Sequence, residues 1–201
     1  MKKLLITGLL LYATAAWSQV KYDTYSLDYW TKQKDFKIEV SGANHMLEKV
    51  WIESSSLDST SKEGYIIVDG KKVEDFISFM NFAKSKYDEW SKTAKDNKVE
   101  ELSKSIEPEN KITTSTAFSY GKWQFAYGVR LNPKFILDKK GANLVISTGQ
   151  LQSSSNKFIK NDGLVLVFSS SKEIQDFIDK FNIQKMIDVL NKKDQKEDLF
   201  K

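Results

Sequence analysis

Cysteine is absent from this 201-residue sequence, which also contains only one histidine and two prolines. The absence of cysteine excludes disulfides, thiolate metal sites, iron–sulfur clusters and a cysteine nucleophile. The single histidine, His45, excludes a histidine-rich metal site, and any Ser-His-Asp triad would have to use it. We therefore expect neither a bound metal nor a cofactor.

Apolar runs long enough to cross a membrane are also missing, and the longest apolar stretch covers residues 4–16. Two lysines precede this stretch, and the small residues Ala16 and Ser18 follow in the pattern of a cleavage site. The stretch is shorter than the ~20 residues that a membrane-spanning helix needs. We predict a signal peptide at residues 1–18, cleaved before Gln19. The mature chain would then be an exported periplasmic or extracellular protein without a transmembrane segment.

Neither sign of charge dominates the chain, since 31 lysines and arginines stand against 27 acidic residues. Loss of Lys2 and Lys3 with the signal peptide lowers the formal net charge from +4 to +2. Acidic and basic residues are well mixed, which is typical of a solvated surface, so we expect no nucleic-acid partner. Hydrophobic residues make up 40% of the sequence, enough for a packed core.

Two stretches of the sequence resemble each other in the same order. Gly-Ala-Asn at 42–44 recurs at 141–143, and Ser-Ser-Ser at 54–56 recurs at 153–155. Later matches follow at the same or nearly the same spacing: Gly64 with Gly163, Asp75 with Asp176, Phe76 with Phe177, and Asn81 with Asn182. We predict an internal duplication of a β-β-β-α unit, at about residues 36–81 and 135–182. The alternative is coincidence between two generic strand–turn–helix units.

Periodicity within these stretches predicts the elements of the fold. Expected strands cover residues 36–40, 46–52, 65–68, 144–151 and 164–168, a further strand lies near 22–30, and a hairpin covers 113–129. Expected helices cover residues 73–94, 98–106 and a segment from 171 that bends near Asn182, with Ser170 and Glu173 forming a capping box. The fold class is α+β: a mostly antiparallel sheet with amphipathic helices on one face, forming one domain at 19–190 before a charged, flexible tail at 191–201.

Catalytic motifs are scarce in this sequence. It contains no nucleophile elbow, phosphate-binding glycine loop, dinucleotide fingerprint or acidic calcium loop. A pair of carboxylates that meet in space could still hydrolyse glycosidic bonds. The candidate residues for such a pair are Asp58, Asp75, Asp138, Asp162 and Asp176.

The predicted hairpin at 113–129 has the clearest binding potential. Trp123, Phe125 and Tyr127 alternate with smaller or polar residues and therefore share one face. Our main interpretation is that this face packs under a helix as core. The alternative is a binding face on which Trp123 and Tyr127 stack against a sugar or a hydrophobic ligand, with Tyr120 exposed at the turn.

These observations favour an exported, non-enzymatic binding protein whose candidate binding residues are Tyr120, Trp123 and Tyr127. Its partner would be another protein, a small molecule or a glycan. One alternative is a secreted hydrolase that uses a carboxylate pair. Another is a structural or inhibitory protein that acts through a flat face. The sequence predicts neither the ligand nor the oligomeric state.

Overall fold

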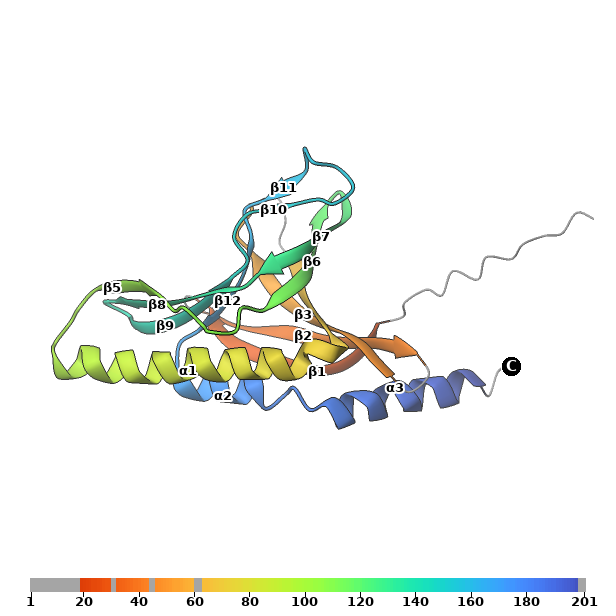
Figure 1. Cartoon of the computed structure of the whole chain (residues 1–201), viewed down its shortest axis with the longest axis horizontal. Helices are drawn as coiled ribbons and strands as arrows, with labels where there is room; N and C mark the ends of the chain where they lie inside the picture. Colours follow the sequence, from red (N-terminus) through yellow and green to blue (C-terminus); the bar gives the residue numbers. More distant parts are fainter. Residues whose placement is uncertain (1–18, 30–31, 44–45, 60–62, 199–201) are drawn as a thin grey trace, which may run out of the picture.

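The structure, a computed structural model, describes residues 19–29, 32–43, 46–59 and 63–198 (Figure 1). The predicted signal peptide at 1–18 and His45 lie outside these ranges. Within them, no helix is both long enough and apolar enough to cross a bilayer.

The described chain is an α+β fold, as the sequence predicts. Its strands are β1 (Val20–Tyr29), β2 (Lys32–Ala43), β3 (Met46–Ser56), β4 (Glu63–Asp69), β5 (Leu102–Ser105), β6 (Thr113–Tyr120), β7 (Lys122–Arg130), β8 (Asn132–Asp138), β9 (Gly141–Ser147), β10 (Leu151–Gln152), β11 (Lys160–Asn161) and β12 (Leu164–Phe168). Its helices are α1 (Val73–Asp96), α2 (Ser171–Ile178) and α3 (Ile183–Asp198), with a 3-10 turn at Gly70–Lys72 before α1.

Ten of the strands form one curled antiparallel sheet, and β10 and β11 form a separate two-stranded ribbon. The main path through the large sheet runs β5-β8-β9-β12-β3-β4-β6-β7. The β1–β2 pair branches from this path at β3, where β2 and β12 share the edge opposite β4. Along Met46–Ile52, β3 pairs with β2, whereas its last residues, Ser55 and Ser56, pair with β12. This exchange of partner makes β3 the strand that joins the two parts of the sheet.

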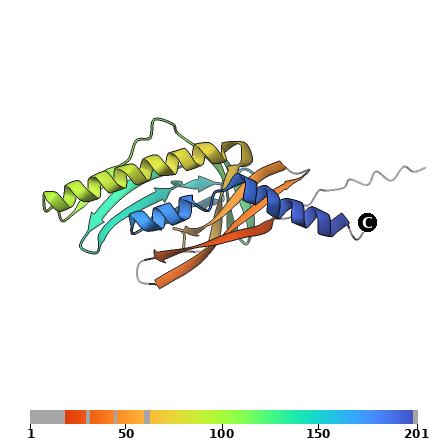
Figure 2. The same ribbon diagram turned by 90° about the horizontal axis from the view of Figure 1, so that it is seen from below.

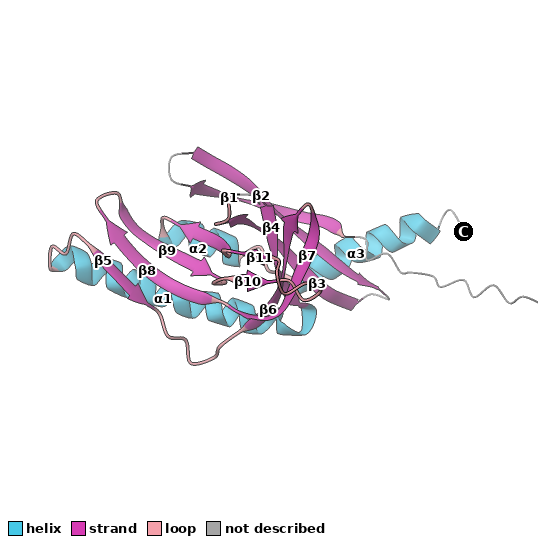
Figure 3. Cartoon of the chain, turned by 90° about the horizontal axis from the view of Figure 1, so that it is seen from above, coloured by secondary structure: helices cyan, strands magenta, loops and turns pink. Residues whose placement is uncertain are grey.

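The three helices lie on one face of this sheet (Figures 1 and 2). Seen from the opposite side, the strands lie in front and the helices behind them (Figure 3). The strands place alternate residues in the core between the layers, as Val50 and Ile52 on β3 and Ile66 and Val68 on β4 show. The helices add apolar stripes that include Phe76 of α1.

An aromatic cluster anchors α2 to the sheet. The ring of Phe177 lies 4.8 Å from Tyr25 of β1 and 5.2 Å from Phe168 of β12, measured between centroids. Phe181, in the turn after α2, lies 5.0 Å from Phe177 and 5.0 Å from Phe76 of α1. These contacts join both helices and two strands in one core.

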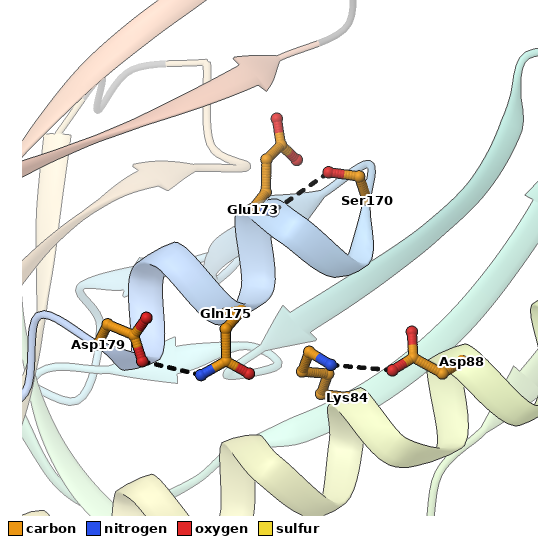
Figure 4. Close-up of polar contacts among 6 residues, drawn as sticks. All are labelled: Lys84, Asp88, Ser170, Glu173, Gln175 and Asp179. Carbon is orange, nitrogen blue, oxygen red and sulfur yellow. Dashed lines mark hydrogen bonds and ion pairs between the residues drawn. The ribbon is translucent and has the colours of Figure 1, made fainter.

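The capping box at α2 is confirmed in part. The Ser170 hydroxyl accepts a hydrogen bond from the Glu173 backbone N–H at 3.1 Å (Figure 4). The Glu173 carboxylate accepts from the backbone N–H and hydroxyl of Ser169, one residue earlier than the motif predicts. A side chain therefore satisfies one free N–H group in the first turn of α2, that of Glu173. Along the same helix Gln175 bonds Asp179, while Lys84 and Asp88 pair at 3.0 Å on α1 (Figure 4).

One expectation for the helices is wrong. Residues 98–106 do not form a polar helix, because α1 ends at Asp96 and the chain reverses at Lys98, which has φ +53°. The segment that follows forms β5, an edge strand paired with β8. The expected tail at 191–201 is helical as far as Asp198, since α3 continues the helix predicted after Asn182. The N-terminal strand, the hairpin at 113–129 and the break near Asn182 are confirmed.

The two predicted copies contain the same succession of elements. In the first, β2, β3 and β4 pair in order and lead into α1. In the second, β8, β9 and β12 pair in order and lead into α2, with the β10–β11 ribbon inserted after β9. The common origin of the copies stays a prediction.

Candidate functional site

A patch of aromatic residues covers the sheet on the side away from the helices. We call it the aromatic face and define it by Trp51 of β3, Tyr65 of β4, and Trp123, Phe125 and Tyr127 of β7. Strand alternation directs Trp51 to this side, because its neighbours Val50 and Ile52 enter the helix-covered core. On β7, Phe125 joins the aromatic face while Ala126 joins that core. Helices lie only on the opposite side in the described chain (Figure 3).

The rings of this face touch in sequence across the strands. The Trp51 and Tyr65 rings meet edge to face with centroids 6.1 Å apart, and Tyr65 lies 5.7 Å from Trp123. Both contacts are diagonal across the strands. Trp51 lies opposite Ile67, two residues from Tyr65, and Tyr65 lies in line with Phe125 across Ala117, two residues from Trp123. The inner part of the patch is therefore packed.

The outer members of the face remain in contact with solvent. Trp123 is 48% exposed and Tyr127 is 64% exposed, while Tyr120 at the β6–β7 turn is 52% exposed. The expectation that Trp123, Phe125 and Tyr127 pack under a helix as core is therefore wrong. Its physical reason is that the other side of β7 is the buried one: the Gln124 side chain bonds Ser153 beside the β10–β11 ribbon, and Ala126 joins the core. The exposure predicted for Tyr120 is confirmed.

The supporting side chains hold the rings in defined positions. The buried Trp51 indole N–H donates to the Ser41 hydroxyl at 3.1 Å. Ile67 and Ala117 fill the space between Trp51, Tyr65 and Phe125. Trp123 thus presents one part of its ring to solvent while another part rests on Tyr65, which limits the rotamer freedom it would lose on binding.

Three carboxylates border the aromatic face. Glu53 lies directly opposite Tyr65 in the β3–β4 ladder, and Glu39 lies opposite Trp51 in the β2–β3 ladder. Burial raises the pKa of the Tyr65 phenol well above its ordinary value of about 10. The negative charge of Glu39 and the hydrogen bond to it raise that pKa further, as do the charges of Glu53 and Glu63.

The raised pKa predicts how the stability of the chain depends on alkaline pH. The unfolded chain releases the Tyr65 proton above about pH 10, whereas the folded chain retains it. This contribution to stability is complete below pH 10 and is lost as the pH rises further. We expect Tyr65→Phe to show a shallower loss of unfolding free energy between pH 9.5 and about pH 11 than the parent. Urea titrations at several pH values would measure both slopes, and parallel slopes would contradict the prediction.

Sequence reasoning missed Trp51, Tyr65, Glu39 and Glu53 as neighbours of the hairpin aromatics. The available signal was alternation, because Trp51 stands between two core residues of a predicted strand. It was insufficient because it does not reveal which strands are adjacent. β4 pairs with β6, and the long helix α1 separates these two strands in the sequence.

The two serine runs at 54–56 and 153–155 are partly buried. Ser54 and Ser55 belong to β3 and are buried there. In the second run, the buried Ser153 hydroxyl donates to the side-chain amide oxygen, Oε1, of Gln124 on β7 at 2.8 Å. The Ser154 backbone N–H donates to the Phe125 carbonyl at 2.7 Å and fixes the ribbon against β7. Ser153 and Ser154 therefore hold the β10–β11 ribbon against β7.

Two grooves of the described chain each contain at most one of the aspartates proposed as a catalytic pair. A groove of about 770 Å³ between β1 and α2 is lined by Asp176, together with Asp23, Asp179 and Lys180. Asp23 and Lys180 form an ion pair at 3.1 Å, and Asp176 pairs with Lys172. A smaller groove of about 200 Å³ beside Pro108 contains none of the five aspartates. The geometry gives the hydrolase alternative no support.

Among the described residues, no three acidic or histidine side chains lie close enough together to hold a metal ion. Comparisons of the chain with protein-family models, with curated proteins and with solved structures find no match.

Proposed function

We propose that this chain is an exported, non-enzymatic binding protein that recognises a glycan through the aromatic face. The observation that carries the proposal is the state of Trp123, which is half exposed and yet held against Tyr65. A flat ring fixed in this way can stack on the apolar side of a sugar ring at a small cost in side-chain entropy. Tyr127 extends the same surface along β7, whereas Tyr120 lies opposite Lys122 and so belongs to the other side of the hairpin.

The polar surroundings of the rings favour a glycan over a purely apolar ligand. Glu39 and Glu63 supply carboxylate oxygens beside Tyr65, and such oxygens accept hydrogen bonds from sugar hydroxyls. Trp51 and Ile67, the most apolar parts of the patch, are already buried under their neighbours. A site for a purely apolar ligand would instead be a concave pocket lined mainly by hydrophobic side chains.

The proposal predicts that Trp123→Ala weakens glycan binding about fivefold or more while the protein stays folded, since a lost stacking partner costs roughly 1 kcal/mol or more. Affinity electrophoresis of residues 19–201 in gels containing soluble cellulose, chitosan, xylan or mannan would detect a polysaccharide that retards the protein. Titration calorimetry with its oligosaccharide would then measure the affinity of each variant.

Phe158→Ala supplies the matched control. Phe158 is 83% exposed on the loop between β10 and β11, so its removal also deletes an accessible aromatic ring, but not one of the aromatic face. Equal loss of affinity in both variants would contradict the assignment of the site. The absence of retardation in every gel would contradict glycan binding. A protein partner that binds through Trp123 would then be the ligand class to test.

A further inference from the structure

We propose that the tip formed by the β10–β11 loop and the β6–β7 turn binds the surface of an anionic phospholipid bilayer. We call this surface the apical tip and define it by Lys157, Phe158 and Lys160 of the loop and by Tyr120 and Lys122 of the turn. Figure 1 shows both segments at the end of the molecule opposite the helices. These residues do not belong to the aromatic face, so lipid binding would be additional to glycan binding.

Phe158 is the most exposed large hydrophobic side chain of the described residues, at 83%. Hydrogen bonds nevertheless fix the loop that carries it. The Ser153 N–H donates to the Ile159 carbonyl at 2.9 Å and closes the loop, and the Ile159 N–H donates to the Asn156 carbonyl at 3.0 Å. The Phe158 N–H itself donates to the Asn156 side chain at 3.0 Å. The ring is therefore presented on an ordered backbone, which limits the entropy lost on binding.

The β6–β7 turn places a second aromatic ring on the same side of the hairpin as this loop. Tyr120 lies opposite Lys122, and Gln124 is the next residue of β7 on that side. The Gln124 side chain accepts the Ser153 hydroxyl at 2.8 Å, which places the loop beside this side of the hairpin. Tyr120 is 52% exposed there. Trp123 alternates to the opposite side and rests on Tyr65, so the apical tip and the aromatic face are separate surfaces.

Lysines surround the two exposed rings. Lys122, Lys157 and Lys160 are all exposed, and segments 119–122 and 153–160 contain no acidic residue. The Lys157 Nζ lies 5.4 Å from the centroid of the Phe158 ring. The ion pairs of the described residues involve none of these three lysines. The apical tip is therefore positively charged.

The acidic residues at this end of the sheet lie at the base of the ribbon or on the other side of the strands. Asp162 follows β11 and leads back toward β12. Asp58 lies near Gly163 at the same base, because the residue before Asp58 donates its N–H to the Gly163 carbonyl. Glu63 shares the side of Tyr65 on β4, which is the side of the aromatic face.

A lipid surface fits this combination better than a protein partner does. Lysine is depleted in protein–protein interfaces, whereas lysines beside exposed aromatic residues are typical of segments that bind at the membrane interface. Aromatic rings insert at the level of the headgroups, and lysines are attracted to anionic phospholipids. Charge complementarity therefore favours an anionic bilayer over a zwitterionic one.

Co-sedimentation with lipid vesicles tests the proposal. Residues 19–201 are used, so that the apolar stretch at 4–16 does not itself bind lipid. Vesicles of phosphatidylcholine alone are compared with vesicles that also contain about 30% phosphatidylglycerol. We expect binding to the anionic vesicles to be about tenfold stronger or more. The difference should shrink as the salt concentration rises from about 0.1 M to about 0.5 M.

Two variants locate the contact at the apical tip. Phe158→Ala should weaken binding to the anionic vesicles about tenfold, because the ring no longer leaves water for the bilayer. Lys157→Gln combined with Lys160→Gln should weaken it about tenfold or more at low salt, because two attractions to the headgroups are lost.

Each variant has a matched control elsewhere on the surface. Met46→Ala removes another exposed apolar side chain, at the end of β3 away from the ribbon. Lys92→Gln combined with Lys95→Gln removes the same charge from exposed residues of α1. Both controls should bind the anionic vesicles as the parent does. Thermal unfolding of all four proteins verifies that they are folded.

The outcomes decide between a lipid-binding tip and its absence. Loss of binding in both tip variants, with binding retained in both controls, would support the proposal. Equal binding to the two vesicle types, or binding to neither, would overturn it. Equal losses in the two lysine pairs, or in Phe158→Ala and Met46→Ala, would also overturn it, because the contact would not lie at the apical tip. Glycan binding is measured without lipid, so its failure would leave these results unchanged.

Discussion

Gly163→Ala is expected to reduce the free energy of unfolding by about 3 kcal/mol or more, since it adds a steric clash to backbone strain. Gly163 has φ +123°, a conformation that residues with a side chain rarely adopt. A Cβ atom at this position would lie 2.5 Å from the Gly149 carbonyl oxygen. The added Cβ atom and the Gly149 carbonyl oxygen are both fixed to the backbone, so neither can move aside without disturbing the strands.

The hydrogen bonds around Gly163 increase the expected effect. Its N–H donates to the Asn161 side chain at 2.9 Å, and its carbonyl accepts from the Leu57 N–H at 2.9 Å. The next residue, Leu164, donates to the Thr148 hydroxyl at 2.9 Å. A shift of the backbone that relieves the clash would therefore weaken bonds to three other segments.

Gly121→Ala is the control for Gly163→Ala. Gly121 has φ +67° at the β6–β7 turn, and nothing lies within 4 Å of the position of its Cβ. This variant should lose only about 1–2 kcal/mol of stability, the cost of placing a residue with a side chain in the left-handed conformation. Urea unfolding curves of the two variants and the parent would measure both losses. Equal losses would show that the contact with Gly149 does not determine the effect.

Phe177→Ala is expected to remove about 3–5 kcal/mol of stability, the usual cost of deleting a buried phenylalanine ring. Phe177 is 1% exposed and contacts the rings of Tyr25, Phe76, Phe168 and Phe181. Because it joins α2 to β1 and β12, its loss opens a cavity at the meeting point of two layers. For a domain of this size the melting temperature should fall by about 10 °C or more.

Differential scanning calorimetry would compare Phe177→Ala with Phe158→Ala. The latter removes an exposed ring and should change the stability by less than about 0.5 kcal/mol. Phe177→Leu fills part of the cavity and should give an intermediate melting temperature. A Phe177→Ala protein as stable as the parent would mean that α2 contributes little to the core.

Much of this fold is predictable from local patterns. Alternation in Trp123–Tyr127 correctly identifies a strand whose aromatics share a face, and the three- and four-residue spacing after Val73 correctly identifies α1. Local patterns failed where tertiary contacts decide the structure. Residues 98–106 carry apolar side chains at helical spacing, but Leu102 lies opposite Leu137 because the edge of β8 was available for pairing.

The candidate site was only half predictable for the same reason. The sequence identifies Trp123 and Tyr127 as neighbours on one strand, which requires only a period of two. It does not identify Tyr65 and Glu39 as their surroundings, because those residues arrive through pairings between β2, β3, β4 and β6. Nor does alternation alone show which side of the sheet the helices cover, and this side determines whether the aromatic residues become core or surface.

The exchange of partner along β3 has a consequence for the rate of folding. The hairpins β1–β2, β2–β3 and β3–β4 close between neighbouring segments and can form early. The pairing of Ser55 with Val165 closes a loop that includes α1 and eight further strands. Since closing long loops costs chain entropy before any contact compensates for it, this step should limit the folding rate. The end of β3 therefore stays an open strand edge, able to pair with another chain, until β12 arrives.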